Sequence, residues 1–193
     1  TEQLEAYERL LVDTNQHVNL ISRADENDAR LHHVVHSLAL SYRSFPAGSR
    51  VVDWGTGGGL PGLPLAIRFP EVSFEVIDAT RKKILAVRRM IRQLGLSNVE
   101  ARHGRAENWD GSADYAVSRA TAPIRSLWQW YDRVRRPLTL DLGETDWTPG
   151  LLALKGGELS GEIRDLREEN PSLEINLIPL QPILGNQFFH QKV

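Results

Sequence analysis

The sequence of 193 residues has no cysteine, a single methionine and no long apolar run. Without cysteine the chain cannot form disulfide bonds or metal sites with thiolate ligands, although this says little about the cellular compartment. A helix needs roughly 20 consecutive apolar residues to cross a membrane, and no stretch of the sequence approaches that length. We therefore expect no membrane partner, with the cytoplasm as the default location.

An excess of positive charge is also absent, because 25 acidic residues stand against 23 Lys and Arg residues and the formal net charge is −2. This balance excludes a protein that coats nucleic acid through its bulk charge, so any contact with RNA has to come from a local basic patch. A chain of this length can bury roughly 70% of its unfolded surface in one core. Since no repeat or linker divides the chain, we expect a single domain over residues 1–193 and a monomer.

The order of the patterns along the chain indicates an α/β fold. Apolar residues repeat at helical spacing over residues 1–13, and a second helix is expected from about residue 28 to residue 43. From residue 50 on, short apolar runs alternate with helical patterns, which is typical of βαβ units and a parallel sheet with helices on both faces. Two extended segments near the end are close enough to pair as a hairpin. The sequence therefore predicts a Rossmann-like fold with a mostly parallel, seven-stranded sheet, an antiparallel last strand, an N-terminal helical cap (1–45) and a core (46–193).

The stretch from Val51 to Gly62 has the pattern of a buried strand, a glycine loop and the first turn of a helix. Gly55, Gly57 and Gly59 permit positive φ angles and close approach of a ligand to the bare backbone. Pro61 suits the first helical turn, where its missing N–H would be unpaired anyway. At the carboxyl edge of a parallel sheet, such a stretch forms a cradle for a nucleotide-like ligand.

The spacing of the glycines alone leaves the nucleotide open. Gly57-x-Gly59-x-x-Gly62 fits the dinucleotide fingerprint, with Asp78 near the end of the next strand to hold a ribose, as in a nicotinamide-dependent oxidoreductase. Asp53 argues against this alternative, because a pyrophosphate at the helix N-terminus would meet a carboxylate directly before the loop. S-adenosylmethionine carries no phosphate, has an ammonium and a sulfonium group, and offers ribose hydroxyls. The two carboxylates therefore favour a methyl donor.

Two later segments follow expected strands and belong to the same edge. Ala106 and Glu107 come after the third strand, where a small residue could lie against an adenine and a carboxylate near its exocyclic amine. On these residues alone, the simpler interpretation of Glu107 is a first-turn acid or a partner of Arg105. Arg119 ends the fourth strand, a position that faces the cleft in this architecture, and a structural ion pair is the alternative.

Basic side chains gather on one flank of the helix that follows the second strand: Arg81, Lys82, Arg88, Arg89 and Arg92. Two interpretations stay open, a solvated helix face and a surface that contacts phosphates. The nearby cleft favours the phosphate contact.

The histidines and asparagines of the first 45 residues are candidates of another kind. His32 and His36 have the i, i+4 spacing of a metal pair, but with no cysteine and no third ligand nearby we expect a solvent-facing flank and no metal. Asn15, Asn19 and His33 could contact RNA, although an asparagine at a helix end is more often a cap. No arrangement of Ser, His and Asp indicates a nucleophile.

The most specific motifs are the Gly-Leu-Pro-Gly ending of the loop and a Leu-Lys-Gly strand. They occur with five other short patterns, and the full set is Asn15-x-x-x-Asn19-Leu20, His33-x-x-x-Ser37, Asp53-x-Gly55-Thr56-Gly57-x-Gly59-Leu60-Pro61-Gly62, Asp78-x-x-x-Lys82, Arg105-Ala106-Glu107, Ser118-Arg119-Ala120 and Leu154-Lys155-Gly156. Over nearly the whole chain, this set resembles the RsmG (GidB) family of S-adenosylmethionine-dependent methyltransferases, which act on guanine N7 in small-subunit ribosomal RNA.

The resemblance implies a class I methyltransferase whose partner is 16S ribosomal RNA or the small ribosomal subunit. Combined with the loop residues above, it predicts a binding site for S-adenosylmethionine formed by Asp53, Gly55, Gly57, Leu60, Asp78, Ala106, Glu107 and Arg119. The expected RNA contacts are Arg81, Lys82, Arg88, Arg92 and Lys155. Guanine N7 has an in-plane lone pair and no proton, so we expect no catalytic base and only an orienting role for Arg119. A non-catalytic RNA-binding or assembly protein on the same fold is a further alternative.

Three features depart from the pattern of the family. Trp54 stands where a smaller aliphatic residue is usual, and we expect it to repack the floor of the glycine loop. His36 stands where an Asp usually precedes the Ser, which affects a contact of the helical cap. The last segment lacks the usual Arg before the closing Lys, which affects RNA contacts there.

Overall fold

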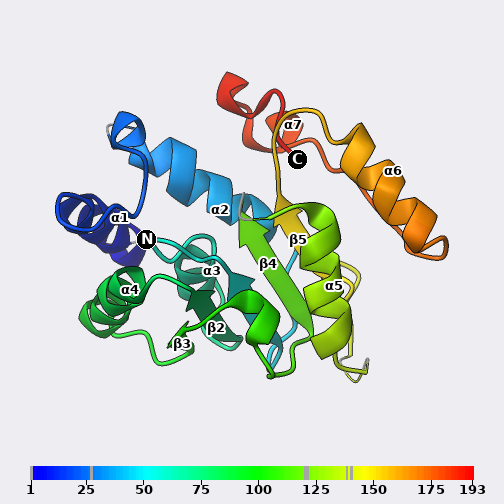
Figure 1. The fold of residues 1–193 in the computed structure, drawn as a ribbon. Coiled ribbons are helices and arrows are strands. Elements are labelled where there is room, and N and C mark those ends of the chain that lie inside the picture. Colours follow the sequence, from blue (N-terminus) through cyan, green and yellow to red (C-terminus); the bar gives the residue numbers. More distant parts are fainter. Residues whose placement is uncertain (1, 27, 120–121, 138, 140) are drawn as a thin grey trace.

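The central sheet of the computed structural model has five strands, all parallel, in the order β3-β2-β1-β4-β5 (Figure 1). The structure describes residues 2–26, 28–119, 122–137, 139 and 141–193. The strand order changes direction between β1 and β4, which is the switch point where α/β sheets bind ligands at their carboxyl edge. The strands are β1 (Arg50–Trp54), β2 (Ser73–Asp78), β3 (Val99–His103), β4 (Tyr115–Arg119) and β5 (Leu151–Leu154).

Helices cover both faces of the sheet, as the alternating pattern predicts. On one face, α3 (Gly62–Arg68) and α4 (Arg81–Leu94) pack against every second strand residue, among them Val51, Phe74 and Val76. On the other face, α5 (Ile124–Val134) packs against residues of opposite parity, and α6 (Ser160–Glu169) packs against α5. Neighbouring residues of β1 therefore point to different helices.

Trp54 belongs to the face covered by α5. Its side chain is fully buried, and its ring lies edge-on to Trp109 and Trp130, with centroid distances of 6.4 and 5.8 Å. Only a 3-10 turn (Ala106–Asn108) separates β3 from β4, so Trp109 covers sheet surface that a crossover helix would otherwise cover. The expectation that Trp54 repacks the floor of the glycine loop is therefore wrong, because its bulk lies among indoles on the α5 face.

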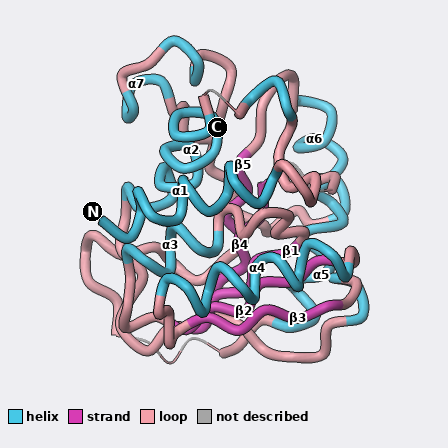
Figure 2. The backbone as a smooth tube through the Cα atoms, turned by 90° about the vertical axis from the view of Figure 1, so that its left-hand side faces the viewer, coloured by secondary structure: helices cyan, strands magenta, loops and turns pink. Residues whose placement is uncertain are grey.

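The N-terminal cap lies over the α3 and α4 side of the sheet. Its first helix, α1 (Glu2–Asn15), packs against α3 and α4, and α1 and α4 come to the front in Figure 2. The expected second helix is a helical segment of changing pitch, with a π turn (Arg30–Val35), α2 (His36–Leu38) and a 3-10 turn (Ala39–Tyr42). A 3-10 turn (Arg23–Asp25) joins the two parts. No helix among the described residues is long and apolar enough to cross a membrane.

The prediction of seven strands with an antiparallel last strand is wrong. Among the described residues, 173–179 pair with no strand, and the chain then forms α7 (Gln181–Leu184) and a 3-10 turn (Gln187–Phe189). Local chemistry explains the turns, because Pro182 sits in the first turn of α7, Gly185 ends it at φ 64°, and the Asn186 side chain accepts a hydrogen bond from the Phe188 N–H. Within the part of the chain that the structure describes, the antiparallel pairing is limited to a bridge between Gly156 and Lys192.

Candidate functional site

The glycine loop connects β1 to α3 at the carboxyl edge of the sheet. Gly55, Gly57 and Gly59 have φ angles of 70°, 56° and 93°, which confirms the positive φ expected of them. The N–H groups of Gly55 and Thr56 both donate to the carbonyl of Ile77 at 2.9 Å, so β2 holds the start of the loop. The loop thus offers bare backbone at the switch point of the sheet.

Asp53 lies beneath this loop with no exposed surface. Its Oδ2 accepts hydrogen bonds from the Thr56 hydroxyl at 2.6 Å and from the Gly62 N–H at 2.9 Å, so one oxygen fastens both ends of the loop. A Cβ on Gly62 would lie 2.8 Å from that oxygen and 2.5 Å from Val76 Cγ1, which explains a glycine there. Burial raises the pKa of Asp53 to about 7. The argument that its charge repels a pyrophosphate therefore loses force, because the carboxyl is shielded by the loop.

Asp78 ends β2 beside the loop and is nearly buried. Its Oδ2 accepts from the Gly57 N–H at 3.0 Å, and its Oδ1 accepts from the Thr80 N–H at 2.7 Å. Each carboxylate oxygen has a second lone pair, so Asp78 keeps acceptor capacity for hydroxyl groups. It is the carboxylate that the structure brings to the rim of the loop.

The segment after β3 lies at the same edge, because the Gly104 N–H donates to the Asp78 carbonyl at 3.1 Å. Ala106 is partly buried, whereas Glu107 is exposed and pairs with Arg105 at 3.4 Å. The Arg105 pair is thus present, but an exposed pair of this kind contributes little stability and leaves the Glu107 carboxylate accessible to a ligand. Leu60 has a buried side chain in the core, which leaves its backbone as the part available to a ligand.

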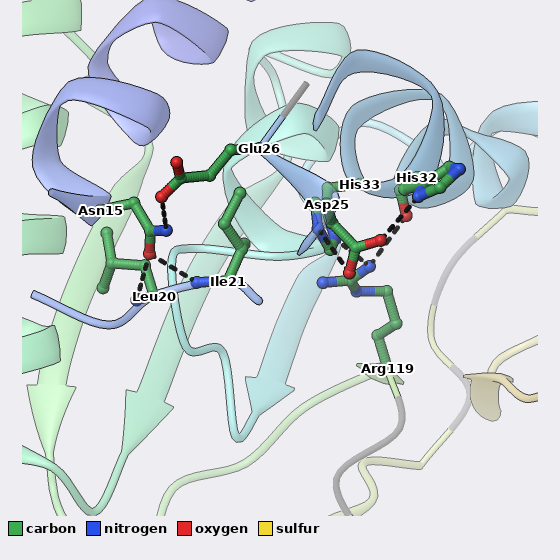
Figure 3. A network of polar contacts seen from close by, with 8 residues as sticks. All are labelled: Asn15, Leu20, Ile21, Asp25, Glu26, His32, His33 and Arg119. Carbon is green, nitrogen blue, oxygen red and sulfur yellow. Dashed lines mark hydrogen bonds and ion pairs between the residues drawn. The ribbon is translucent and has the colours of Figure 1, made fainter. Parts of the chain in front are cut away.

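Arg119 ends β4 on the other side of the loop and reaches into the helical cap (Figure 3). Its Nη1 donates to the carbonyl of His32 at 3.1 Å and to Nδ1 of His33 at 2.7 Å. Burial lowers the pKa of Arg119, and the nearby Tyr7, Asp53 and Asp25 oppose this shift. Arg119 therefore connects the sheet edge to the cap.

The cap also contacts the glycine loop directly, a feature that the sequence did not reveal. The Tyr7 hydroxyl donates to the Gly58 carbonyl at 3.0 Å, and a Cβ on Gly58 would lie 2.6 Å from Leu11 Cδ1. Tyr7 is fully buried, and its position on the apolar stripe of α1 indicated only a core residue. The cap is thus one wall of the candidate site.

Asn15 organises the turn between α1 and the next helical segment (Figure 3). Its Oδ1 accepts from the N–H groups of Leu20 and Ile21 at 2.7 and 2.9 Å, and its Nδ2 donates to Glu26 at 2.6 Å. Only 5% of Asn15 is exposed, so the structure favours the capping role over contact with RNA.

The histidine pair of the cap is not a solvent-facing flank, which corrects that expectation. His36 is buried against Phe188 and Phe189, and the His32 ring stacks on Phe188 with a centroid distance of 3.9 Å. Burial and the nearby Arg119 lower the pKa of His36 to about 3. Among the described residues, no group of three or more His, Cys, Asp or Glu side chains could hold a metal ion.

The basic side chains lie on two distant parts of the fold. Arg81, Lys82, Arg88 and Arg92 are exposed on α4, where Arg88 Nε also donates to the Ala101 carbonyl at 2.9 Å. Lys155 follows β5, at the opposite edge of the sheet from β3. Its side chain is 12% exposed, and its Nζ donates to the Ala122 carbonyl at 2.8 Å and pairs with Glu162 at 3.3 Å. The structure therefore does not bring Lys155 to the basic face of α4.

The GidB family model, described as rRNA small subunit methyltransferase G, matches residues 1–178. The chain belongs to the GidB family. Relatives include the Ribosomal RNA small subunit methyltransferase G of Salinibacter ruber, 47% identical over 99% of this chain and 89% of that protein. The protein of the same name from Chlorobium luteolum is 42% identical over 99% of this chain and 78% of that protein.

Solved structures of methyltransferases have a fold similar to that of this GidB chain. A SAM-dependent methyltransferase from Aquifex aeolicus matches with a TM-score of 0.53 at 16% identity, covering 77% of this chain and 85% of that one. A precorrin-6y C5,15-methyltransferase from Geobacter metallireducens matches with a TM-score of 0.54 at 11% identity, covering 70% and 68% of the two chains. Identities this low support the fold alone.

Proposed function

We propose that this chain transfers the methyl group of S-adenosylmethionine to N7 of a guanine in small-subunit (16S) ribosomal RNA. Membership of the GidB family, whose members carry the name rRNA small subunit methyltransferase G, supports the reaction class and the RNA. The observation that carries the proposal is the cradle itself, in which the positive-φ glycines and Asp78 meet at the switch point of the sheet. A nicotinamide-dependent oxidoreductase has no comparable support.

The residues of the cradle fit S-adenosylmethionine. Among the described residues, the atoms that a Cβ built on Gly57 would meet lie at 3.6 Å or more, so its bare backbone leaves room for a ligand against the loop. Asp78 offers acceptor lone pairs to ribose hydroxyls, and Ala106 with Glu107 forms the far side of the edge. We propose that Gly55, Gly57, Leu60, Asp78, Ala106, Glu107 and Arg119 hold the methyl donor, with Asp53 acting indirectly by fixing the loop.

Methyl transfer to N7 requires the protein to align the two reactants, and it requires no proton transfer. When bound, S-adenosylmethionine supplies a methyl group on a positively charged sulfur. The N7 lone pair forms the new C–N bond as the C–S bond breaks, its electron pair stays on sulfur, and S-adenosylhomocysteine leaves. Holding two reactants in line can contribute roughly 7 to 11 kcal/mol. The glycine loop and the cap wall would supply this alignment.

Arg119 has a limited choice of roles in this reaction. An arginine that bonded guanine O6 and N7 together, the common contact in the major groove, would block the nucleophile. We therefore propose that Arg119 orients the methyl donor, guanine O6 or a phosphate. No side chain is assigned as a general base.

The exposed basic face of α4 is the proposed contact with RNA phosphates, through Arg81, Lys82, Arg88 and Arg92. Lys155 is set apart, because its ammonium group already bonds the Ala122 carbonyl and Glu162, and we propose that it supports the start of α5. We further propose that the chain works as a monomeric, single-domain protein in the cytoplasm, with naked RNA or the small subunit as partner.

The test is transfer of a labelled methyl group from S-adenosylmethionine to small ribosomal subunits that lack base methylation, followed by mapping of the modified base. Label on a guanine N7 is expected. RNA binding without transfer would favour the non-catalytic assembly protein, and tighter binding of NADH than of S-adenosylmethionine would favour the oxidoreductase. Gly57→Ala, with a strained positive φ, should weaken binding of the methyl donor in calorimetry, whereas Gly157→Ala shares the positive φ away from the loop and serves as the control.

A further inference from the structure

The contact between Arg119 and His33 joins the two halves of the candidate site. Arg119 comes from the carboxyl end of β4, and His33 comes from the π turn of the cap (Figure 3). Their separation of 2.7 Å between Nη1 and Nδ1 is that of a hydrogen bond to a charged donor. His33 is only 7% exposed, so this bond forms away from water.

The direction of the bond fixes the state of the imidazole. A guanidinium has only N–H donors, so Nδ1 of His33 must carry no proton and accept. Nε2 then carries the hydrogen, and it faces Oδ2 of Asp25 at 3.8 Å. Asp25 also accepts from Nδ1 of His32 at 2.7 Å. Burial and the Arg119 charge lower the pKa of His33 to about 4, which keeps the ring neutral at neutral pH.

We propose that His33 is a positioning residue, which holds the Arg119 guanidinium where it meets the methyl donor and does so only when the cap is docked on the sheet. This inference rests on the proposed function. The Arg119 donor selects the tautomer with a bare Nδ1, whereas Asp25 lies beyond hydrogen-bond distance of Nε2 and adds only an electrostatic attraction to its hydrogen. The cap would then set the position of a residue of the core.

A purely structural role of His33 predicts a different response to substitution. A buried side chain that only fills space can be replaced by an apolar residue of similar size, often with little loss of stability. A side chain that orients an arginine needs an acceptor at one point in space. Asparagine places its amide oxygen near the Nδ1 position of the histidine, glutamine places an amide near Nε2, and leucine provides no acceptor.

The experiment compares His33→Asn, His33→Gln and His33→Leu with wild type and with the exposed cap variant His17→Asn as control. The readouts are the Kd of S-adenosylmethionine by calorimetry, the free energy of unfolding in urea, and kcat and KM for methyl transfer. Loss of the charged hydrogen bond in the Leu variant should raise the Kd roughly 10- to 100-fold. The Gln variant should resemble it, and the Asn variant should stay within about threefold of wild type.

The inference is overturned if Kd follows the order of stability, or if the Asn and Leu variants bind the methyl donor equally well. A measurement on wild type alone also decides it: ¹⁵N NMR of the His33 ring should show Nδ1 without a proton and Nε2 with one. The opposite tautomer or a charged ring at pH 7 would refute it. If wild type binds S-adenosylmethionine but methylates no guanine, the proposed reaction fails, while the order of Kd values and the tautomer still decide the role of His33.

Discussion

Replacing Asp53 by asparagine tests how the glycine loop is held. The carboxyl is fully buried, and its Oδ2 accepts from Thr56 and Gly62, while Oδ1 has no hydrogen-bond partner among the described residues. An amide oxygen can accept the same two bonds, with the NH₂ group in the place of Oδ1. The substitution thus keeps the shape and removes the ability to ionise.

The effect on stability depends on pH in a direction set by the pKa of Asp53. Burial raises that pKa from 3.8 to about 7 in the folded state. The folded protein therefore binds the proton more tightly than the unfolded chain, so the contribution of this carboxyl is present in acid and is lost as pH rises through the folded pKa. The loss is about 1.4 kcal/mol per pH unit, which gives about 4 kcal/mol between pH 4 and pH 7.

The assay is urea unfolding of wild type and Asp53→Asn at several pH values from 4.5 to 8. His33 and His36 also change stability over this range, but they are present in both proteins and cancel in the difference. The Asn variant should gain stability relative to wild type as pH rises and level off above pH 7. Parallel pH profiles for the two proteins would refute the assignment of a raised pKa to Asp53.

Three further predictions concern packing, RNA and acid stability. Gly62→Ala should lower the free energy of unfolding by about 1 to 3 kcal/mol, because the new Cβ meets the buried side chains of Val76 and Asp53. Gly161→Ala in α6 is the control: its Cβ meets no described atom within 4 Å, so this variant should be neutral or slightly stabilising. Arg92→Ala should reduce the slope of log K for RNA binding against log salt concentration by about 0.7 to 0.9. The control is Arg164→Ala, an exposed position on α6, which should leave the slope unchanged. Equal slopes for both variants and wild type would show that the basic face of α4 is only a solvated surface. His36→Leu should flatten the loss of stability between pH 6.5 and pH 4 by about 1.4 kcal/mol per unit, since burial lowers the pKa of His36 to about 3; an unchanged acid limb would contradict this.

The strand, loop and helix around the glycines could be predicted from the sequence because each signal there is local. Short apolar runs indicated β1 through β5, and the glycines and Pro61 indicated the turn into α3. The last two predicted strands failed because a strand also needs a partner, and an alternating pattern does not supply one. The residues after Leu180 follow their proline, glycine and asparagine into turns instead.

For the candidate site, the sequence did not predict the directions in which the side chains point. Asp53 looked like a ligand-facing acid because it precedes the loop, but strand parity turns it toward α3, where the Gly62 N–H meets it. Lys155 was predicted as an RNA contact from its motif alone, which did not show that its ammonium group bonds the Ala122 carbonyl and Glu162. The role of Tyr7 depends on a contact across 51 positions in the chain, which no local pattern encodes.

The indole cluster around Trp54 gives the protein a built-in optical reporter. Trp54, Trp109 and Trp130 are close enough for their excited states to couple, so together they should give a shared near-ultraviolet circular dichroism signal. That signal arises on the face covered by α5, whereas the cap and the side chain of Asp53 lie on the other face. Loss of the coupled signal should therefore follow separation of α5 from the sheet.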